Sequence, residues 1–168
     1  MEEFTKRLSV SQSMEFDCES DEVWRMISEP GNLNHTHPFC KSNEVIRWDK
    51  ENHSDRLVYL NELNYIRNFI TWDEGLGYSL LIGEEGGPQS YVVWEINSVK
   101  GGRSELRITV YPYVLARLPI YIGYLPHAIW LRPRLKKYLR SVLSGYQYYL
   151  KNGKTTPRNH FGRHPWFS

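Results

Sequence analysis

The stretch "RLKKYLRSVLSGYQYYLK", residues 134–151, decides the fold of this chain because its apolar side chains recur at intervals of three and four. Such spacing places them on one face of an α-helix. Polar and basic side chains occupy the opposite face, and Gly153 follows as a typical C-terminal cap. We therefore predict a long amphipathic helix that packs against an apolar surface through Leu135, Tyr138, Leu139, Val142, Leu143, Tyr146, Tyr149 and Leu150.

Six runs of strand-forming residues precede this helix, and short turn-forming segments separate them. The segments "DEGLG" at 73–77, "EEGGP" at 84–88 and "KGG" at 100–102 are typical of tight turns between neighbouring strands. Their short spacing favours an antiparallel meander. The expected strands are 44–48, 56–63, 65–72, 78–83, 89–99 and 103–111.

The N-terminal part adds one more strand and one or two short helices. Alternation of apolar and polar residues predicts a half-buried strand through Leu8, Val10, Met14 and Phe16. The segment "SDEVWRMISEPG", residues 20–31, predicts a short helix with Ser20 as its N-cap and the Pro-Gly pair as its stop. The segment "NLNHTHPFCKSN", residues 32–43, is either a loop or one more helical turn.

This order of elements resembles the START and birch-pollen-allergen superfamily, also called SRPBCC or polyketide-cyclase-like. The resemblance is carried by "DEVWRMISEPGNL" at 21–33, "YVVWEINSVKGGRSELRITV" at 91–110 and the final helix. It implies an α+β helix-grip fold, in which a seven-stranded antiparallel sheet curves around the long C-terminal helix and short helices follow the first strand. The closing "NHFGRHPWFS", residues 159–168, also resembles the ending of a bacterial subgroup of this superfamily.

The domain organisation expected from this resemblance is simple. One domain spans residues 1–153, and residues 154–168 form a tail packed on it. We expect the tail to be ordered, because Phe161, Trp166 and Phe167 together offer enough apolar area to hold it in place.

The resemblance further implies a cavity between sheet and helix that holds a hydrophobic or amphipathic, lipid-like molecule, as in a carrier or sensor. Two alternatives stay open: a polyketide cyclase or aromatase-like enzyme, and an interaction module. A curved sheet with one helix leaves an interior that either side chains or a ligand must fill. The residues expected to bind the ligand are Tyr59, Glu62, Arg67, Phe69, Trp94, Tyr124, Trp130, Leu139 and Tyr146.

Catalytic signals in the sequence are weak, and we nominate no catalytic residue. Glu62 and Arg67 are the polar candidates for a place inside the cavity. Arg67 shares strand parity with Tyr65 and Phe69, so an inward face would carry it into the cavity, where it could hold a carboxylate or phosphate. The opposite face of the strand, with Ile66, Ile70 and Trp72, is equally apolar, so the sequence does not decide which face points inward.

The segment "LPIYIGYLPHAIW", residues 118–130, is too apolar for an ordinary surface loop. It lies within residues 112–131, where the superfamily has only a short connection, so we interpret these residues as an apolar insertion at the cavity mouth. Full exposure would be costly in water. We favour a lid over the cavity; a fixed plug, a membrane contact and a partner chain or second copy are the alternatives.

Charge is distributed unevenly along the chain. All 19 acidic residues lie at or before Glu105, whereas 11 of the 21 basic residues lie after it. This asymmetry predicts either an anionic partner or a solvated basic helix face. Basic residues also crowd the start of the long helix, where they oppose the helix dipole. Either the helix begins earlier, near Pro126, or these residues contact an anionic target, either a membrane surface or another anion: Arg132, Arg134, Lys136, Lys137 and Arg140.

Several other functions are disfavoured. The pair His35 and His37 lacks further converging ligands, so we expect no metal, and we expect the histidines to lie in loops or at the surface. No phosphate-binding glycine loop or GxSxG motif is present, and we expect no cofactor. Nucleic-acid binding is disfavoured because no stacking sheet accompanies the basic residues. Cys18 and Cys40, without CxxC spacing, are expected to be buried thiols.

The sequence also bears on location. Residues 108–131 are weakly charged, but three prolines make them a poor membrane-spanning helix. The N-terminal "MEEFTKRLSV" has no apolar stretch of signal-peptide length. We therefore expect a cytoplasmic protein, with peripheral membrane binding left open by the basic residues and the apolar insertion.

Overall fold

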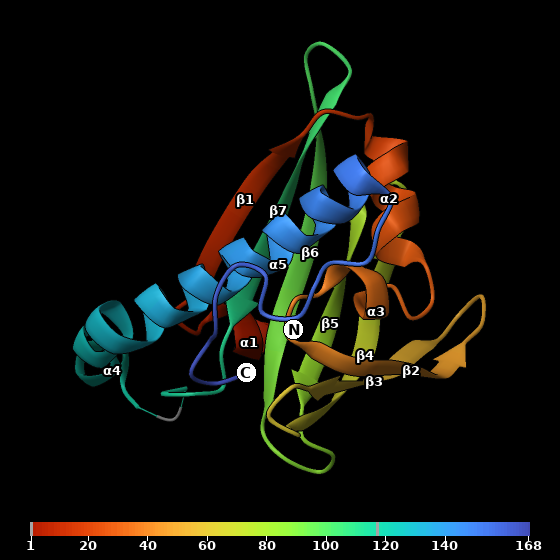
Figure 1. Ribbon diagram of the computed structural model, residues 1–168. Coiled ribbons are helices and arrows are strands. Elements are labelled where there is room, and N and C mark those ends of the chain that lie inside the picture. The colour runs from red at the N-terminus through yellow and green to blue at the C-terminus, as the bar shows by residue number, and fades with distance from the viewer. Residues whose placement is uncertain (1, 117) are drawn as a thin grey trace.

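The computed structural model describes residues 2–116 and 118–168, so residue 117 of the predicted insertion lies outside the described part (Figure 1). Its centre is a seven-stranded antiparallel sheet in the order β1-β7-β6-β5-β4-β3-β2. Every consecutive pair from β2 to β7 is a hairpin, and β1 returns to pair with β7. The strands are β1 Val10–Phe16, β2 Cys40–Trp48, β3 His53–Tyr59, β4 Asn64–Asp73, β5 Gly77–Gly83, β6 Gln89–Val99 and β7 Arg103–Tyr111.

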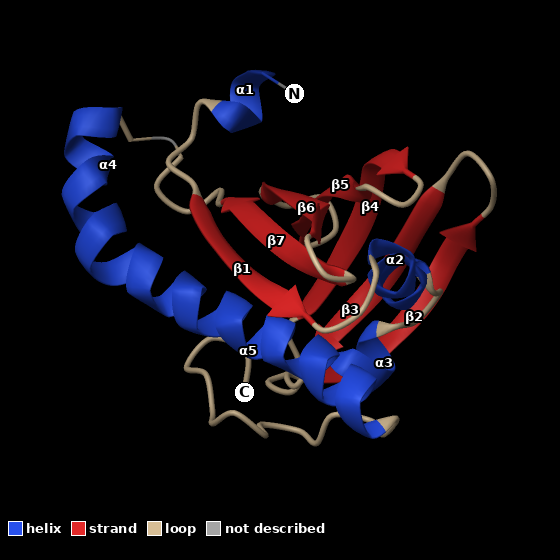
Figure 2. Cartoon of the chain, turned by 90° about the horizontal axis from the view of Figure 1, so that it is seen from above, coloured by secondary structure: helices blue, strands red, loops and turns tan. Residues whose placement is uncertain are grey.

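One long helix crosses the concave side of this sheet, and the short helices lie around it (Figure 2). This arrangement confirms the predicted α+β helix-grip fold. No helix among the described residues is long and apolar enough to cross a membrane. The helices are α1 Glu2–Thr5, α2 Ser20–Ser28, α3 Leu33–Thr36, α4 Ile120–Pro126, the π-helical turn η1 His127–Leu131, and α5 Arg132–Asn152.

Helix α5 packs as its sequence pattern predicts. Leu135, Leu139, Val142 and Tyr146 are all buried against the rest of the core. Gly153 ends the helix with φ of 60°, a conformation that glycine adopts at little cost, and its N–H donates to the Tyr149 carbonyl at 2.8 Å. The sequence pattern of three and four therefore identifies the buried face correctly.

Some predicted boundaries need correction. The third strand was expected at 56–63, but β3 ends at Tyr59 because the chain turns there: Glu62 has φ of 69° and its N–H donates to the Tyr59 carbonyl. Strand β2 begins at Cys40, four residues before the expected start. Ser20 is the first helical residue of α2, whereas Glu19 occupies the N-cap without a side-chain hydrogen bond.

The long helix begins earlier than residue 132. Helix α4, η1 and α5 follow one another without a break, so Arg132 through Arg140 lie well inside a continuous helical segment. Pro126 ends α4, and the Arg132 N–H bonds back to the carbonyl of His127, five residues earlier. This π-helical turn absorbs the irregularity that a proline introduces into a helix. The unfavourable placement of cations at a helix N-terminus is thereby avoided.

The C-terminal tail packs back over α3 and α5 (Figure 2). The Thr156 N–H donates to the His35 carbonyl, and the Thr156 hydroxyl donates to the Gly145 carbonyl at 2.9 Å. At the end of the tail, the Phe167 ring stacks on Tyr59 with a centroid distance of 4.5 Å. The last residues of the chain therefore contribute to the interior of the domain.

Candidate ligand-binding cavity

A cavity of about 250 Å³ lies between the concave face of the sheet and α5. Strands β3 to β7 supply its floor, α5 supplies one wall, and η1 and the tail complete it. Most of the lining is apolar, as in small-molecule sites generally. Representative lining residues are Leu57, Leu80, Val92, Trp94, Ile108 and Leu139.

A short chain of polar groups interrupts the apolar lining. His37 Nδ1 accepts a hydrogen bond from the Phe39 N–H at 3.2 Å, so the ring proton is on Nε2. Nε2 lies 3.0 Å from the Tyr138 hydroxyl, to which it therefore donates. The Tyr138 and Tyr59 hydroxyls are 3.1 Å apart. All three residues line the cavity.

Counting protons in this chain shows what it can offer a ligand. The three groups bring three protons, one on His37 and one on each phenol, but only two hydrogen bonds join them. One phenolic O–H is therefore left over. The free O–H belongs to Tyr59 if Tyr138 donates to Tyr59, and to Tyr138 if Tyr59 is the donor. These three hydrogen-bonded side chains thus leave one hydrogen-bond donor for a ligand in an apolar cavity.

The ionisation of these groups is strongly biased toward the neutral forms. Burial, followed by the nearby positive charge of Arg67, lowers the pKa of His37 to about 3. Burial likewise raises the pKa of Tyr59, Tyr65 and Tyr138. A charged form of any of them would lose hydration in this interior. Near neutral pH, the cavity therefore hydrogen-bonds but does not exchange protons readily through these residues.

Arg67 faces inward, which settles the strand face that the sequence left open. Its guanidinium is 3% exposed and is held by Asp55 of β3, which is fully buried. Arg67 Nε donates to Asp55 Oδ1 at 2.7 Å, and Nη2 donates to Oδ2. The fork that could have received a ligand carboxylate is therefore already occupied by Asp55. The pair contributes no net charge to the cavity.

Four aromatic side chains of the cavity lining are partly exposed to solvent. Tyr65 of β4 and Tyr113, which follows β7, bring their hydroxyls within 3.4 Å of each other. Trp130 of η1 and Trp166 of the tail have ring centroids 5.4 Å apart. All four line the cavity. Aromatic side chains from distant parts of the sequence thus form a partly exposed portion of the lining.

Five of the nine predicted ligand-binding residues line the cavity: Tyr59, Arg67, Trp94, Trp130 and Leu139. They come together because β3, β4, β6, η1 and α5 all border the same space. The other four lie elsewhere and require correction. Two of these are at the surface, and two belong to other parts of the core.

The two surface residues were misplaced for local reasons. Glu62 lies in the turn after β3, where its side chain is 68% exposed and its carboxylate pairs with Lys41 at 2.6 Å. Tyr124 lies on α4 and is 59% exposed. The prediction placed Glu62 on a strand that ends three residues earlier, and it placed Tyr124 on a segment that does not fold back over the cavity.

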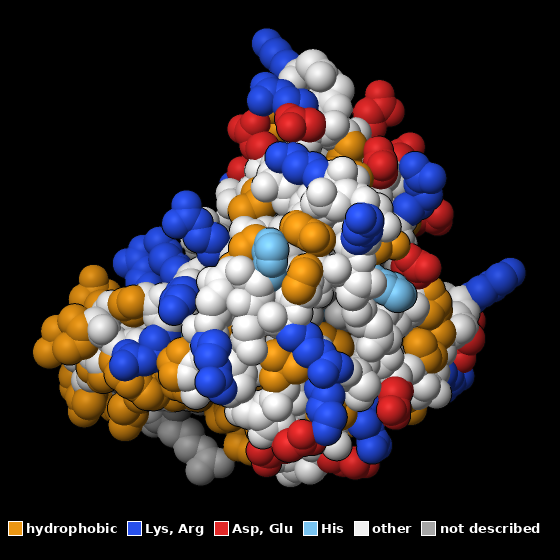
Figure 3. All heavy atoms as spheres, viewed as in Figure 1, with side chains coloured by type: hydrophobic (Ala, Val, Ile, Leu, Met, Phe, Trp, Pro, Cys, Tyr) orange, Lys and Arg blue, Asp and Glu red, His pale blue; other side chains and the backbone are white. Residues whose placement is uncertain are grey.

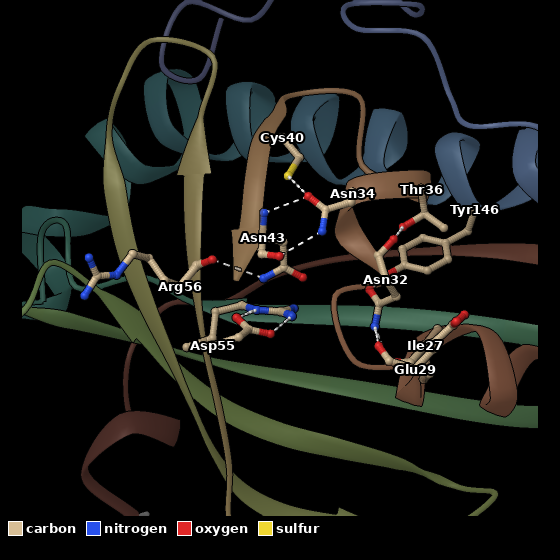
Figure 4. Close-up of polar contacts among 11 residues, drawn as sticks. Ile27, Glu29, Asn32, Asn34, Thr36, Cys40, Asn43, Asp55, Arg56 and Tyr146 are labelled. Carbon is tan, nitrogen blue, oxygen red and sulfur yellow. Dashed lines mark hydrogen bonds and ion pairs between the residues drawn. The ribbon is translucent and has the colours of Figure 1, made fainter. Parts of the chain in front are cut away.

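The two core residues serve packing. Phe69 belongs to an aromatic cluster with Trp48, Trp72 and Tyr78. The Tyr146 hydroxyl donates to Asn32 Oδ1 at 2.8 Å, and the Asn32 amide donates in turn to the Ile27 and Glu29 carbonyls (Figure 4). Tyr146 therefore ties α5 to the end of α2 instead of facing the cavity.

Sequence reasoning missed His37, Tyr138 and Asp55. His37 and His164 lie in loops, as expected, but both side chains are buried, and His37 is only 5% exposed. Tyr138 was identified only as part of the helix face. Asp55 lay in a segment read as a turn. Asp55 alternates with Leu57 and Tyr59 in "HSDRLVY", and extending the strand back to include it would have placed it on their buried face.

Helix α4 does not close the cavity as a lid. The two ends of the predicted insertion line the cavity through Pro112, Tyr113, Val114, Trp130 and Leu131, whereas no described side chain of residues 118–129 does. Helix α4 instead extends beyond the β1 edge of the sheet (Figures 1 and 2). Within the described residues, there is no group of three or more His, Cys, Asp or Glu side chains placed to hold a metal ion.

Comparisons with known proteins identify the fold. No protein-family model and no curated protein matches the chain. The structure of TTHA0849 from Thermus thermophilus superposes with a TM-score of 0.68 at 16% identity, over 87% of this chain and 99% of that one. The ZhuI aromatase/cyclase from a Streptomyces species superposes with a TM-score of 0.60 at 13% identity, over 89% and 99%.

Larger proteins of the same fold also match. The di-domain aromatase/cyclase BexL superposes with a TM-score of 0.66 at 15% identity, over 86% of this chain and 46% of BexL. The chain thus spans about half the length of that protein. These structures confirm the helix-grip fold.

Proposed function

We propose that this chain binds a compact, neutral hydrophobic or amphipathic molecule in the cavity between the sheet and α5, as a carrier or sensor. The observation that carries the proposal is an apolar cavity of about 250 Å³ with an unused phenolic hydrogen-bond donor. Apolar burial would supply the affinity, and the donor would supply orientation.

The volume limits the size of the ligand. Small-molecule sites commonly measure about 300–1,000 Å³, so the volume of this cavity lies just below that range. A two- or three-ring molecule or a short acyl chain fits such a space better than a two-chain lipid. We therefore narrow the lipid-like ligand to a compact one.

The polar groups limit its chemistry. The spare phenolic O–H beside His37 favours a ligand with an acceptor oxygen, such as a ketone. An ionised ligand is disfavoured because Asp55 already neutralises Arg67. A neutral ligand with an acceptor oxygen brings no unpaired charge into the cavity and satisfies the phenolic donor.

An aromatase/cyclase-like enzyme is the second candidate, favoured by the tyrosine hydroxyls that line the same cavity. They could hold the carbonyl oxygens of a polyketone chain. General acid–base catalysis works best when a group has a pKa near the working pH. The low pKa of His37 and the raised pKa values of the tyrosines therefore favour binding over turnover. Cyclisation of a polyketone by the purified protein would favour the enzyme.

The proposal is tested with prodan, a neutral naphthyl ketone whose emission reports the polarity of its surroundings. We expect the wild type to bind prodan with a blue-shifted emission. Ile82→Trp should abolish binding because Ile82 lines the cavity. Leu81→Trp, at the adjacent and opposite-facing position on β5, is the matched control and should bind normally. Equal binding by both variants would place the probe outside the cavity.

The role of the phenols is tested by the double variant Tyr59→Phe/Tyr138→Phe. Loss of one hydrogen bond to a ligand corresponds to about 1 kcal/mol, or roughly fivefold in affinity. We expect binding of 2-acetylnaphthalene to weaken by at least about this factor, while binding of naphthalene stays the same. An equal change for both compounds would refute the donor role. Organic extraction of the protein followed by mass spectrometry would then identify any natural ligand.

A further inference from the structure

Helix α4 and η1 expose a cluster of large apolar side chains to solvent. Tyr121 is 81% exposed, Ile129 is 68% exposed and Leu125 is 63% exposed. Figure 3 shows hydrophobic side chains gathered over this end of the molecule. We call this cluster the α4 patch, and it consists of Leu118, Tyr121, Ile122, Tyr124, Leu125, Ile129 and Trp130. Contiguous exposed apolar patches of this kind mark interaction sites in soluble proteins.

The α4 patch continues directly into a basic surface. Because α4, η1 and α5 are continuous, basic residues follow the patch on the same helical segment, and Figure 3 shows Lys and Arg side chains beside it. Arg134 lies over the Trp130 ring at 5.5 Å and so joins the two surfaces. The basic surface consists of Arg132, Arg134, Lys136, Lys137 and Arg140.

No acidic residue balances these charges along the C-terminal part of the chain, since every acidic residue lies at or before Glu105. Near the base of α4, a hollow is lined by Glu3 together with Lys6 and Arg7, which again leaves a positive excess. An apolar patch with aromatic residues beside a basic surface is the combination that suits the interface of an anionic membrane.

A second copy of the chain fits less well. In a two-fold symmetric dimer, each subunit contributes the same surface, so both subunits would bring an excess of positive charge to the interface. An anionic lipid surface instead neutralises this charge and accepts the apolar side chains. Charge complementarity therefore favours a membrane as the occupant.

We propose that the α4 patch and its basic surface dock this protein reversibly on anionic membranes. The apolar side chains of α4 enter the interface, and the basic residues at the start of α5 lie against the lipid headgroups. Trp130 and Leu131 also line the cavity, so docking places the cavity wall next to the bilayer. The docking itself does not depend on what the cavity holds.

The test is co-sedimentation with vesicles of phosphatidylcholine alone and of phosphatidylcholine with phosphatidylglycerol. We expect binding to the anionic vesicles, weaker binding as salt rises, and little binding to the neutral ones. Lys136→Glu/Arg140→Glu should weaken binding by at least about thirtyfold, from about 1 kcal/mol per basic residue at the surface. Leu125→Ser/Ile129→Ser should remove the binding that persists at high salt.

Matched controls separate docking from general effects of charge and hydrophobicity. Lys50→Glu/Lys100→Glu reverses two exposed charges in distant turns, and Ile70→Ser/Leu76→Ser removes two exposed apolar residues from β4 and the turn that follows it. Both control variants should bind like the wild type. Failure of the wild type to bind anionic vesicles at low salt would overturn the proposal, as would equal losses in test and control variants. A dimer in light scattering that Leu125→Ser/Ile129→Ser dissociates would assign the patch to a second copy instead.

Discussion

At the scale of single residues, His37 has the most unusual environment in the candidate site. Its ring contacts Phe39, Tyr59 and Tyr138, and its two nitrogens bond the Phe39 N–H and the Tyr138 hydroxyl. A positive charge there would be buried and close to Arg67, so the ring stays neutral and its pKa falls to about 3. In the unfolded chain, the pKa of histidine is about 6.5.

This difference predicts a pH dependence of stability. As pH falls below about 6.5, the unfolded state binds a proton at His37 that the folded state refuses until about pH 3. The wild type should therefore lose stability by about 1.4 kcal/mol per pH unit from this residue over that window. Denaturant unfolding of wild type and His37→Gln between pH 7 and pH 4 measures the effect, because other histidines contribute equally to both. The stability difference between them should shrink as pH falls; parallel curves would contradict the prediction.

At the scale of elements, α3 and α5 approach each other so closely at Gly145 that this position has no room for a side chain. A Cβ built on Gly145 would lie 1.9 Å from the Thr36 carbonyl oxygen. Thr36 is itself fixed, because its hydroxyl donates to the Asn32 carbonyl within the same network that holds Tyr146 (Figure 4). The contact therefore cannot relax through a side-chain movement.

Gly145→Ala should accordingly destabilise the protein even though alanine favours helices by about 1 kcal/mol over glycine. We expect a net loss of about 1–3 kcal/mol, the usual cost of overpacking a rigid site. Ser144→Ala, the neighbouring position on α5, is the control and should be neutral or slightly stabilising. Thermal unfolding of the two variants compares them; a stabilised Gly145→Ala would show that α3 and α5 are not in close contact.

At the scale of the whole molecule, the two halves of the cavity come from distant parts of the chain. Phe167 at the C-terminus contacts Tyr59 of β3 and Tyr138 of α5, with ring centroids 4.5 and 4.4 Å apart. The His164 ring also bonds the Arg134 carbonyl at 3.1 Å. Folding of the tail and completion of the cavity are therefore coupled.

Two phenylalanines in the tail provide a matched test of this coupling. Phe167 is 9% exposed and lines the cavity, whereas Phe161 is 36% exposed. Phe167→Ala should lower the free energy of unfolding by about 3–5 kcal/mol and weaken prodan binding. Phe161→Ala should have little effect on the free energy of unfolding or on prodan binding. Denaturant unfolding and probe titration measure both. Similar effects of the two substitutions would indicate that the tail does not form part of the cavity.

Local sequence pattern was sufficient for most of the architecture. The alternation in β1, the turn segments between the later strands and the spacing of three and four in α5 each depend only on neighbouring residues. The predicted elements follow from them, with errors at their ends. Apolar periodicity also identified the buried face of α5, because a helix of this length can bury only one face against a single sheet.

Tertiary structure alone decided which strand face points inward and which residues meet in the cavity. In β4, the register shifts between Phe69 and Thr71, so Phe69 and Trp72 pack together although they have opposite parity. Ile70 lies between them and is exposed. Alternation therefore could not identify the inward face. The pairing of Arg67 with Asp55, the proton chain at His37 and the exposure of α4 likewise depend on contacts between distant segments, which local periodicity does not encode.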